Sequence, residues 1–447
     1  MNTSKIKSKI TNIRRTLTVP LIAAAVVAGA GNLGLAASSG VSTTLYTASS
    51  STASLDTSSS SAVTARQACS APAPGKFQCL ADFLPPAAST STSDSTLRPN
   101  TAVPTGYSPA QLQDAYKLTA AVAAGKGTGA TVAIIDAYDD PTAEADLAVY
   151  RTTYGLPACT TANGCFTKES ETGSTTALPP TNGNWAVEIS LDLDMVSAAC
   201  PGCRILLVEA TAPTLPDLSA AENRAAGTAG VVAISNSWSG AENPVDYQYA
   251  AAFDHPGIVI TASSGDAGYG ISAGFPGTLS TVVSVGGTEL DPATGTARGW
   301  SERAWNTATE DGAAGGSWCS AWVDQPSWQH EPICSGRLSV DVSADADPYT
   351  GPSVYDSTPY DGVVYNWLRG GGTSASAPFI AGVYALAGNT ASINDASGLY
   401  AHSRDLFDVR SGDNVMAASC DNSLICTAVR GYDAVTGNGT PNGLGAF

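Results

Sequence analysis

Residues 371–378 read Gly-Gly-Thr-Ser-Ala-Ser-Ala-Pro, and this stretch says more about the fold and the chemistry than any other. Glycines and small side chains precede Ser374, and the apolar run Phe379–Ala387 behind them predicts a helix. A tight turn that leads into a helix N-terminus presents a hydroxyl and free backbone N–H groups to a negative oxygen. Ser374 is therefore a candidate nucleophile.

A serine nucleophile also needs a base, which is usually a histidine. The chain contains three histidines, His255, His330 and His402, and none lies in a recognisable catalytic sequence. A carboxylate is the natural substitute, so the acidic residues become the next candidates.

The stretch Val187–Met195 alternates apolar and polar residues, a period that favours a strand. In a strand Glu188 and Asp192 would lie roughly 13 Å apart. On a helix over Asn184–Ala199 their Cβ atoms would lie about 6 Å apart. Such a helix would be apolar nearly all round, so both carboxyl groups would be partly buried. Two buried carboxylates cannot both ionise cheaply, so the pKa of one is raised and the pair can act as an acid and a base. An ordinary acidic helix face or strand remains the alternative.

A third carboxylate, Asp266, follows the apolar run Ile258–Ala262 within the sequence Ser-Ser-Gly-Asp-Ala-Gly. Catalytic groups of open α/β sheets gather at the carboxyl ends of strands. Asp among glycines is also a common turn residue, so this position has a structural alternative.

The order of apolar runs predicts an α/β fold with a mainly parallel sheet and helices on both faces. Helical patterns, including Asp217–Ala226, alternate with buried strands. Those strands are expected at Thr131–Ile135, Arg204–Val208, Val231–Ser235, Ile258–Ala262 and Val282–Val285. One large domain is expected over residues 106–447, because no break interrupts it.

The N-terminal quarter, residues 1–105, has a different character. Residues 1–37 combine basic residues, a short apolar run and small residues, a layout typical of a signal peptide, and the run is too short to span a bilayer. Residues 38–105 are rich in Ser, Thr, Ala and Pro, which predicts a linker or a short pro-segment. Only Phe77–Leu84 is locally apolar within it. We therefore expect a secreted protein with no membrane segment once the signal is removed.

The formal net charge is −18, and it becomes −23 without the five basic residues of the signal region. An acidic chain argues against nucleic acid and anionic membranes as partners. We expect the protein to be a monomer.

Ten cysteines in an exported chain indicate disulfides, with local pairing as the simplest arrangement. Five near-neighbour pairs are possible: Cys69/Cys79, Cys159/Cys165, Cys200/Cys203, Cys319/Cys334 and Cys420/Cys426.

Taken together, the motifs resemble the sedolisin family of serine-carboxyl peptidases over about residues 106–447. The matching segments appear in the same order along the chain. They are the sequences around Glu188 and Asp192, Asp266 and Ser374, together with Ile234–Trp238, Gly299–Glu302, Val340–Ala344 and Gly431–Gly437.

This resemblance implies a subtilisin-like three-layer fold and a secreted endopeptidase that cleaves proteins and peptides at acidic pH. Ser374 would attack the peptide carbonyl, and Glu188 would be the general base and acid. Asp192 would hold Glu188, and Asp266, when protonated, would donate to the oxyanion. Asp136 matches a position where the family often places a further acid.

The resemblance also implies one structural Ca²⁺ ion. Asp408 and Asp433 match its acidic ligands, and Val409, Val429 and Gly431 would supply carbonyl oxygens. Oxygen ligands suit a hard cation.

The family further implies a large folded pro-domain, whereas only residues 38–105 precede the expected peptidase domain here. Either another inhibitory device or neutral pH alone would then keep the enzyme inactive.

Two other readings remain. A subtilisin-like serine peptidase shares the fold and the Gly-Thr-Ser turn, but it requires a catalytic histidine sequence that this chain lacks. An exported binding or cell-surface protein on a non-catalytic peptidase scaffold is the second. Retention of Glu188, Asp192, Asp266 and Ser374 together argues against it.

Overall fold

The computed structural model describes residues 63–86, 104–270, 274–416, 419–420 and 423–447. The expected signal peptide, residues 1–37, lies outside the described residues. All described residues belong to one unit of the chain, which extends from Ser61 to Phe447. Within these ranges, the helices are too short or too polar to cross a bilayer.

The largest sheet has the strand order β13-β12-β9-β7-β4-β6-β5, and β18 also pairs with β12. Every pair in it is parallel except β12 with β13. Its strands are β4 (Thr131–Ala137), β5 (Phe166–Ser170), β6 (Arg204–Ala210), β7 (Val231–Asn236), β9 (Val259–Ser263), β12 (Val282–Pro292), β13 (Trp300–Ala304) and β18 (Val342–Asp345). The expected mainly parallel sheet is confirmed, and all five expected strands belong to it.

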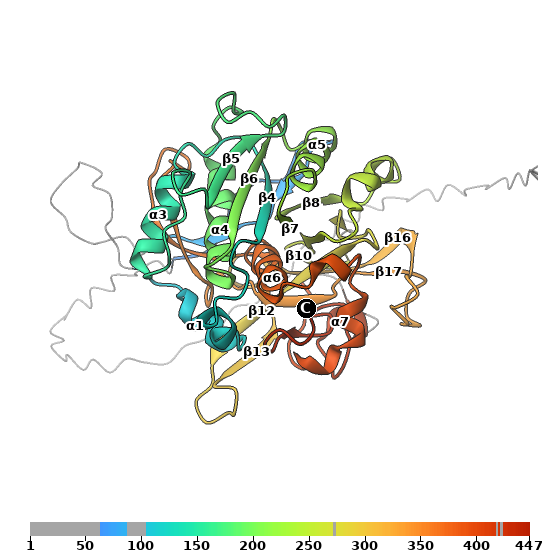
Figure 1. Cartoon of the computed structure of the whole chain (residues 1–447). Helices are drawn as coiled ribbons and strands as arrows, with labels where there is room; N and C mark the ends of the chain where they lie inside the picture. Colours follow the sequence, from blue (N-terminus) through green and yellow to red (C-terminus); the bar gives the residue numbers. More distant parts are fainter. Residues whose placement is uncertain (1–62, 87–103, 271–273, 417–418, 421–422) are drawn as a thin grey trace, which may run out of the picture. The chain divides into compact units, whose positions relative to one another are not determined.

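Helices cover both faces of this sheet. Every residue of β4 is buried, as a strand between two helical layers requires. Helices α4 (Gly183–Ala199) and α6 (Thr373–Ala387) pack against each other and against β4. Helix α5 (Leu215–Ala226) packs on β6, β4 and β7, and Figure 1 shows it on the opposite face of the sheet. The three-layer α/β class is confirmed.

Helix α6 begins at Thr373, earlier than the expected start at Phe379, so Ser374 lies inside its first turn.

The remaining helices are α1 (Pro109–Ala115), α2 (Thr119–Ala123), α3 (Ala143–Thr153), α7 (Ser397–Ala401) and α8 (Ser423–Cys426), with 3₁₀ turns at Asp246–Phe253, Thr390–Ser392 and Ser403–Asp405. The shorter strands outside the N-terminal segment are β8 (Trp238–Ala241), β10 (Ala267–Tyr269), β11 (Gly274–Phe275), β14 (Asn306–Thr307), β15 (Ala313–Ser317), β16 (Cys319–Asp324), β17 (Gly336–Leu338), β19 (Ser353–Asp356), β20 (Asn366–Gly371), β21 (Leu406–Phe407) and β22 (Thr440–Pro441).

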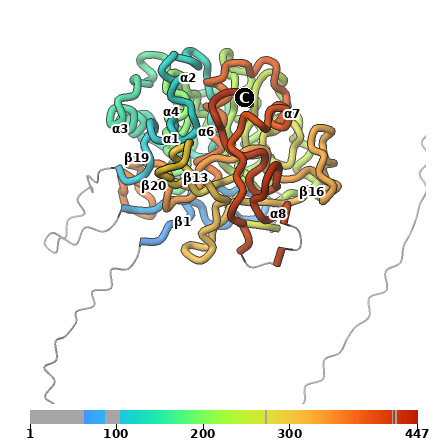
Figure 2. Tube along the Cα trace, turned by 90° about the horizontal axis from the view of Figure 1, so that it is seen from below, coloured from blue at the N-terminus to red at the C-terminus, as the bar shows by residue number. Residues whose placement is uncertain are grey.

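The expected linker or pro-segment is described over residues 63–86, and there it forms strands that join the rest of the unit. Strand β2 (Gln78–Cys79) pairs with β8, and β3 (Asp82–Leu84) lies between β1 (Arg66–Gln67) and β20. Figure 2 shows this segment as the blue tube that includes β1. Residues 63–86 therefore pack as part of the unit, whereas a linker would run outside it.

Five disulfides join the near neighbours that the sequence suggested, so local pairing is confirmed: Cys69–Cys79, Cys159–Cys165, Cys200–Cys203, Cys319–Cys334 and Cys420–Cys426. These bonds fit an oxidising compartment.

Candidate active site

Ser374 lies at the N-terminal end of α6, directly after the turn that leaves β20. The turn depends on Gly372, whose φ of +79° is a left-handed conformation that favours glycine. The Ser374 side chain is fully buried, and its hydroxyl donates to the Ser237 carbonyl at 3.1 Å. Pro378 lacks the N–H that would bond the Ser374 carbonyl within the helix. The Ser237 hydroxyl lies 3.4 Å from that carbonyl.

Glu188 and Asp192 lie one turn apart on α4, as the helical reading of Val187–Met195 predicts. The helix begins after Asn182, whose side chain accepts hydrogen bonds from two backbone N–H groups of the first turn. Every residue from Trp185 to Ala199 is buried, so both carboxyl groups are removed from water.

Burial is the main cause of a strong rise in the pKa of both Glu188 and Asp192. The neighbouring charge of Asp136 raises both values further. A smaller, opposite effect on the pKa of Glu188 comes from the Ser374 hydroxyl and from the backbone N–H of Ala81. The charge of Glu188 also raises the pKa of Asp192. Two buried carboxyl groups one helical turn apart favour a single proton between them, so the pair is suited to act as a proton-sharing device.

Asp136 is the third acid of this group and sits near the end of β4. It is fully buried, and neither carboxyl oxygen receives a hydrogen bond from a described group. Burial raises its pKa to about 8. The neutral acid is therefore its favoured form at neutral and acidic pH.

Asp266 lies on the loop after β9 and contacts Thr373, the residue before Ser374. Its Oδ1 atom accepts two hydrogen bonds from Thr373, one from the backbone N–H at 2.9 Å and one from the hydroxyl at 2.7 Å. Burial raises its pKa to about 7, although the Thr373 hydrogen bonds oppose this rise. Oδ2 is the oxygen left to carry a proton.

Two residues outside the expected set complete this arrangement. The Ser237 hydroxyl donates to Asp192 Oδ1 at 2.7 Å, and the Ser237 carbonyl accepts from Ser374. Thr373 orients Asp266, as described above. Both lie within motifs that the sequence analysis singled out, but their polar contacts depend on tertiary neighbours. All three histidines lie in the described part of the chain, and none hydrogen-bonds to Ser374, Glu188 or Asp266 there.

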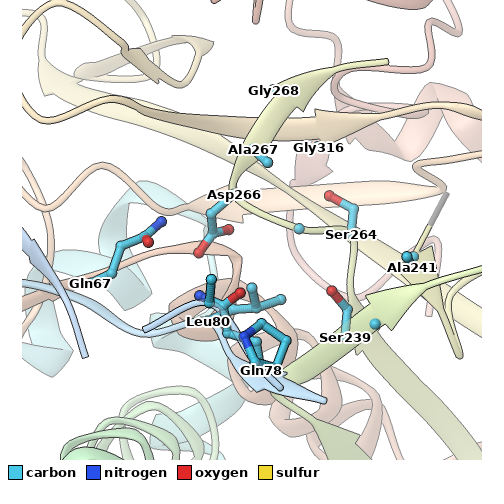
Figure 3. A pocket seen from close by; sticks show the side chains of 15 residues that line it. Gln67, Gln78, Leu80, Ser239, Ala241, Ser264, Asp266, Ala267, Gly268 and Gly316 are labelled. Atoms are coloured by element: carbon cyan, nitrogen blue, oxygen red, sulfur yellow. The ribbon is translucent and has the colours of Figure 1, made fainter. Parts of the chain in front are cut away.

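A cavity of about 330 Å³ opens beside Asp266. One wall is Ser239–Ala241 of β8, and the other is the loop Ser264–Gly268 after β9. Figure 3 shows Asp266 pointing toward Leu80, with Ser239 and Ser264 on neighbouring walls. Asp266, which lines the cavity, accepts hydrogen bonds from Thr373, the residue before Ser374.

The five expected calcium ligands lie on two segments of the C-terminal region, Asp408–Val409 and Val429–Asp433, which meet through the Gly431–Asp408 hydrogen bond. The Gly431 N–H donates to Asp408 at 3.0 Å, and the Val429 N–H donates to Asp433 at 2.9 Å. Asp408 also accepts from Arg410 at 2.7 Å. Among the described groups, none donates a hydrogen bond to the carbonyl oxygens of Val409, Val429 or Gly431. Two carboxylates and three free carbonyls form an all-oxygen donor set, which fits a hard cation.

A second acidic cluster lies elsewhere. Asp140, Asp146 and Asp356 each bring a carboxylate oxygen within 4.8 Å of the others. Hydrogen bonds from Ser357 and Thr358 already satisfy oxygens of all three. The carboxylate oxygens of Asp408 and Asp433 also accept hydrogen bonds, so the case for the expected calcium site rests on its three free carbonyls.

Comparison with known proteins gives one family and one fold. The sequence profile of the subtilase family matches residues 170–403. The chain is similar to a structure of Pseudomonas sedolisin, a serine-carboxyl proteinase complexed with two molecules of pseudo-iodotyrostatin, with 23% identity and a TM-score of 0.63. The match covers 76% of this chain and 96% of the sedolisin chain, and it shows a sedolisin-like subtilisin fold.

A weaker similarity is to fervidolysin from Fervidobacterium pennivorans, a keratinolytic enzyme related to subtilisin. Its identity is 16% and its TM-score is 0.44, over 75% of this chain and 44% of that chain. No curated protein matches the sequence.

Proposed function

The chain belongs to the subtilase family of serine peptidases, and from this premise we propose that it is a secreted serine-carboxyl endopeptidase that cleaves proteins and peptides at acidic pH. One observation carries the proposal. Ser374 lies between a buried carboxyl pair, Glu188 and Asp192, and a third buried carboxyl, Asp266, that has an oxygen free for a proton. This set supports acyl transfer without a histidine.

Ser374 is the proposed nucleophile and Glu188 its general base. The pair Glu188–Asp192 holds one proton, carried by Asp192 on the oxygen that faces away from Ser237. Glu188 is then the ionised member and takes the proton of Ser374 as the hydroxyl oxygen attacks the peptide carbonyl. It returns this proton to the leaving amine, and water then hydrolyses the acyl-enzyme.

Asp266 is the proposed oxyanion donor. In its neutral form it donates a hydrogen bond from Oδ2 to the oxygen that becomes negative in the tetrahedral intermediate. The backbone N–H of Ser374 is the second proposed donor. With a pKa of about 7, Asp266 is protonated below neutral pH, which supports activity in acid.

Secretion is supported by the sequence of residues 1–37 and by the five disulfides. Protein and peptide substrates follow from the peptidase family. We expect the mature protein to act as a monomer.

The decisive test measures cleavage of an acid-unfolded protein between pH 2.5 and 8, for wild type, Ser374→Ala and the matched control Ser376→Ala. Ser376 is buried on the same helix, where its hydroxyl donates to the Ala344 carbonyl at 3.0 Å. We expect cleavage in acid that Ser374→Ala abolishes and Ser376→Ala retains. Folded wild type without Ser374-dependent cleavage at any pH would identify a non-catalytic scaffold.

We also propose one structural Ca²⁺ ion, held by the carboxylates of Asp408 and Asp433 and the carbonyls of Val409, Val429 and Gly431. The free carbonyls described above support this assignment. The ion would join two loop segments and offset the repulsion between the two carboxylates, and it would take no part in the chemistry.

A further inference from the structure

The N-terminal segment Phe77–Leu84 runs through the candidate active site as an extended chain. Gln78 and Cys79 pair antiparallel with Ser239 and Trp238 of β8. On the other side of Leu80 and Ala81, β3 pairs antiparallel with β20, which leads into the Ser374 turn. Backbone pairing on both sides of a nucleophile is how an extended peptide is held for cleavage.

The peptide bond between Leu80 and Ala81 lies at the reacting groups. The Leu80 N–H donates to the Ser237 carbonyl at 3.2 Å, and that same carbonyl accepts from the Ser374 hydroxyl. The Ala81 N–H donates to Glu188 Oε2 at 2.6 Å. Ala81 nitrogen is thus the atom placed to receive a proton from Glu188 when the bond breaks.

The carbonyl oxygen of Leu80 lies on the opposite side, toward Asp266. A Cβ on Gly372 would lie 2.0 Å from Leu80 O and 2.8 Å from Asp266 Oδ2, so only glycine leaves room for both oxygens there. The Leu80 carbonyl is therefore next to the proposed oxyanion donor, and the Leu80 side chain lines the cavity beside it (Figure 3).

The segment is anchored on both sides of this bond. The Cys69–Cys79 disulfide closes a loop directly before Leu80. Phe77 packs edge-on against Trp238, with ring centroids 5.4 Å apart, and Phe83 packs in the same way against Tyr360 at 5.1 Å. Phe83 is fully buried. These contacts hold the intervening peptide in one place.

We propose that Leu80–Ala81 is a processing site, which Ser374 of the same molecule cleaves; the inference rests on the proposed function. Ser374 Oγ forms a bond to the Leu80 carbonyl carbon, and its proton passes to Glu188. The carbon–nitrogen bond to Ala81 breaks as Glu188 protonates the Ala81 nitrogen. Water then attacks the ester and releases the Leu80 carboxylate and the Ser374 hydroxyl.

Before cleavage the segment blocks the site, so it acts as the pro-segment of this chain. The disulfide stays within the N-terminal product, whose new end is Leu80. The other product begins with Ala81. The bound sequence also indicates the substrate class: an extended peptide with an aliphatic side chain before the cleaved bond.

The test follows the full-length chain, purified at neutral pH and shifted to acid, by intact mass and N-terminal sequencing. Wild type should yield a new N-terminus reading Ala-Asp-Phe-Leu-Pro, and Ser374→Ala should remain intact. The first-order rate should stay constant over about a hundredfold dilution, because the bond is already docked. A rate that rises in proportion to concentration would overturn cleavage within one molecule.

Leu80→Asp and Leu84→Asp form a matched pair of variants. Leu80 lines the cavity, whereas Leu84 is partly exposed four residues later. We expect Leu80→Asp to slow the cleavage at least about tenfold, because a polar carboxyl group is poorly accommodated in a cavity that an aliphatic side chain fills, and Leu84→Asp to leave the site unchanged. Equal rates for the two variants would contradict the assignment.

The same samples are tested on an unfolded protein and on a synthetic peptide of residues 77–86 with Cys79→Ser. Ser374-dependent digestion of the protein without a cut at Leu80–Ala81, in the chain or in the peptide, would overturn the processing site and leave the proposed function standing. No Ser374-dependent cleavage of any of the three would overturn both.

Discussion

Thr373 donates two hydrogen bonds to a single oxygen of Asp266, from its backbone N–H and from its hydroxyl. Thr373, the residue before Ser374, thus fixes the rotation of the Asp266 carboxyl group. Since Oδ1 is occupied as an acceptor, a proton on Asp266 is directed to Oδ2, toward the Leu80 carbonyl. The same two hydrogen bonds lower the pKa of Asp266, so they set both the position of its proton and the pH at which the proton is lost.

Replacing Thr373 with Val should move the alkaline limit of activity to higher pH. Hydrogen bonds to the carboxylate lower the pKa of Asp266, so loss of the hydroxyl donor raises it above about 7. The neutral, donating form then persists further into the neutral range. The measurement is kcat/KM against pH. Thr373→Ser keeps the hydroxyl and should keep the wild-type profile, and a downward shift in Thr373→Val would contradict the role of Asp266.

Asp266→Ala should lower kcat by about 10²–10³-fold, the usual cost of one oxyanion donor. Asp266→Asn keeps an N–H donor that does not titrate. We therefore expect it to retain more activity than Asp266→Ala and to lose the alkaline limit near pH 7. Steady-state kinetics of both variants from pH 3 to 8 test this. An alkaline limit that survives in Asp266→Asn would assign it to another group.

The folded protein should become more stable as the pH falls from 7.5 toward 4.5. Burial raises the pKa of Asp266 and of Asp347 to about 7, whereas an unfolded Asp titrates near 3.9. The folded state therefore binds more protons between these values, and the unfolding free energy falls as pH rises through this range. This contribution is complete below about pH 4.

Thermal unfolding of Ser374→Ala measures this trend without self-digestion. Its Tm should be several degrees higher at pH 4.5 than at pH 7.5. Adding Asp347→Asn removes one titrating group and should make the Tm less dependent on pH. A Tm that rises steadily with pH would mean that these carboxyl groups are ionised in the folded protein.

Removal of calcium should lower the Tm at neutral pH. An ion present at about 100 times its Kd adds about 2.7 kcal/mol of stability, which corresponds to a Tm change of roughly 4 °C in a domain of this size. Asp408→Asn should weaken the response to chelator, and Asp405→Asn, an exposed acid nearby, should not. Equal Tm values with calcium and with chelator would remove the proposed ion.

Local pattern was enough to predict several parts of the candidate site. The alternation of Val187–Met195 favoured a strand, and only the helical alternative brought Glu188 and Asp192 together; α4 has that helical geometry. The apolar run before Asp266 predicted the strand β9, at whose carboxyl end Asp266 lies. These predictions depend on residue periodicity and burial, which neighbouring residues largely decide.

Residues 77–84 show the opposite case. The composition around them predicted either a linker or a pro-segment. Their apolar side chains were the only feature that distinguished them from the rest of that region. The pairing of β2 with β8 and of β3 with β20 is made by backbone groups, which every residue type except proline carries in full. A two- or three-residue strand has too few side chains to specify its partner.

The sequence by itself determined five central strands of the parallel sheet and the acids and serine available for catalysis, because an apolar run marks a buried strand locally. Only the tertiary structure decided that Ser237 joins Asp192 to the nucleophile and that Thr373 orients Asp266. It alone placed the Leu80–Ala81 bond against Glu188. The physical reason is that hydrogen bonds act over about 3 Å, so these contacts, between residues 45 to 137 positions apart, exist only once the chain has folded.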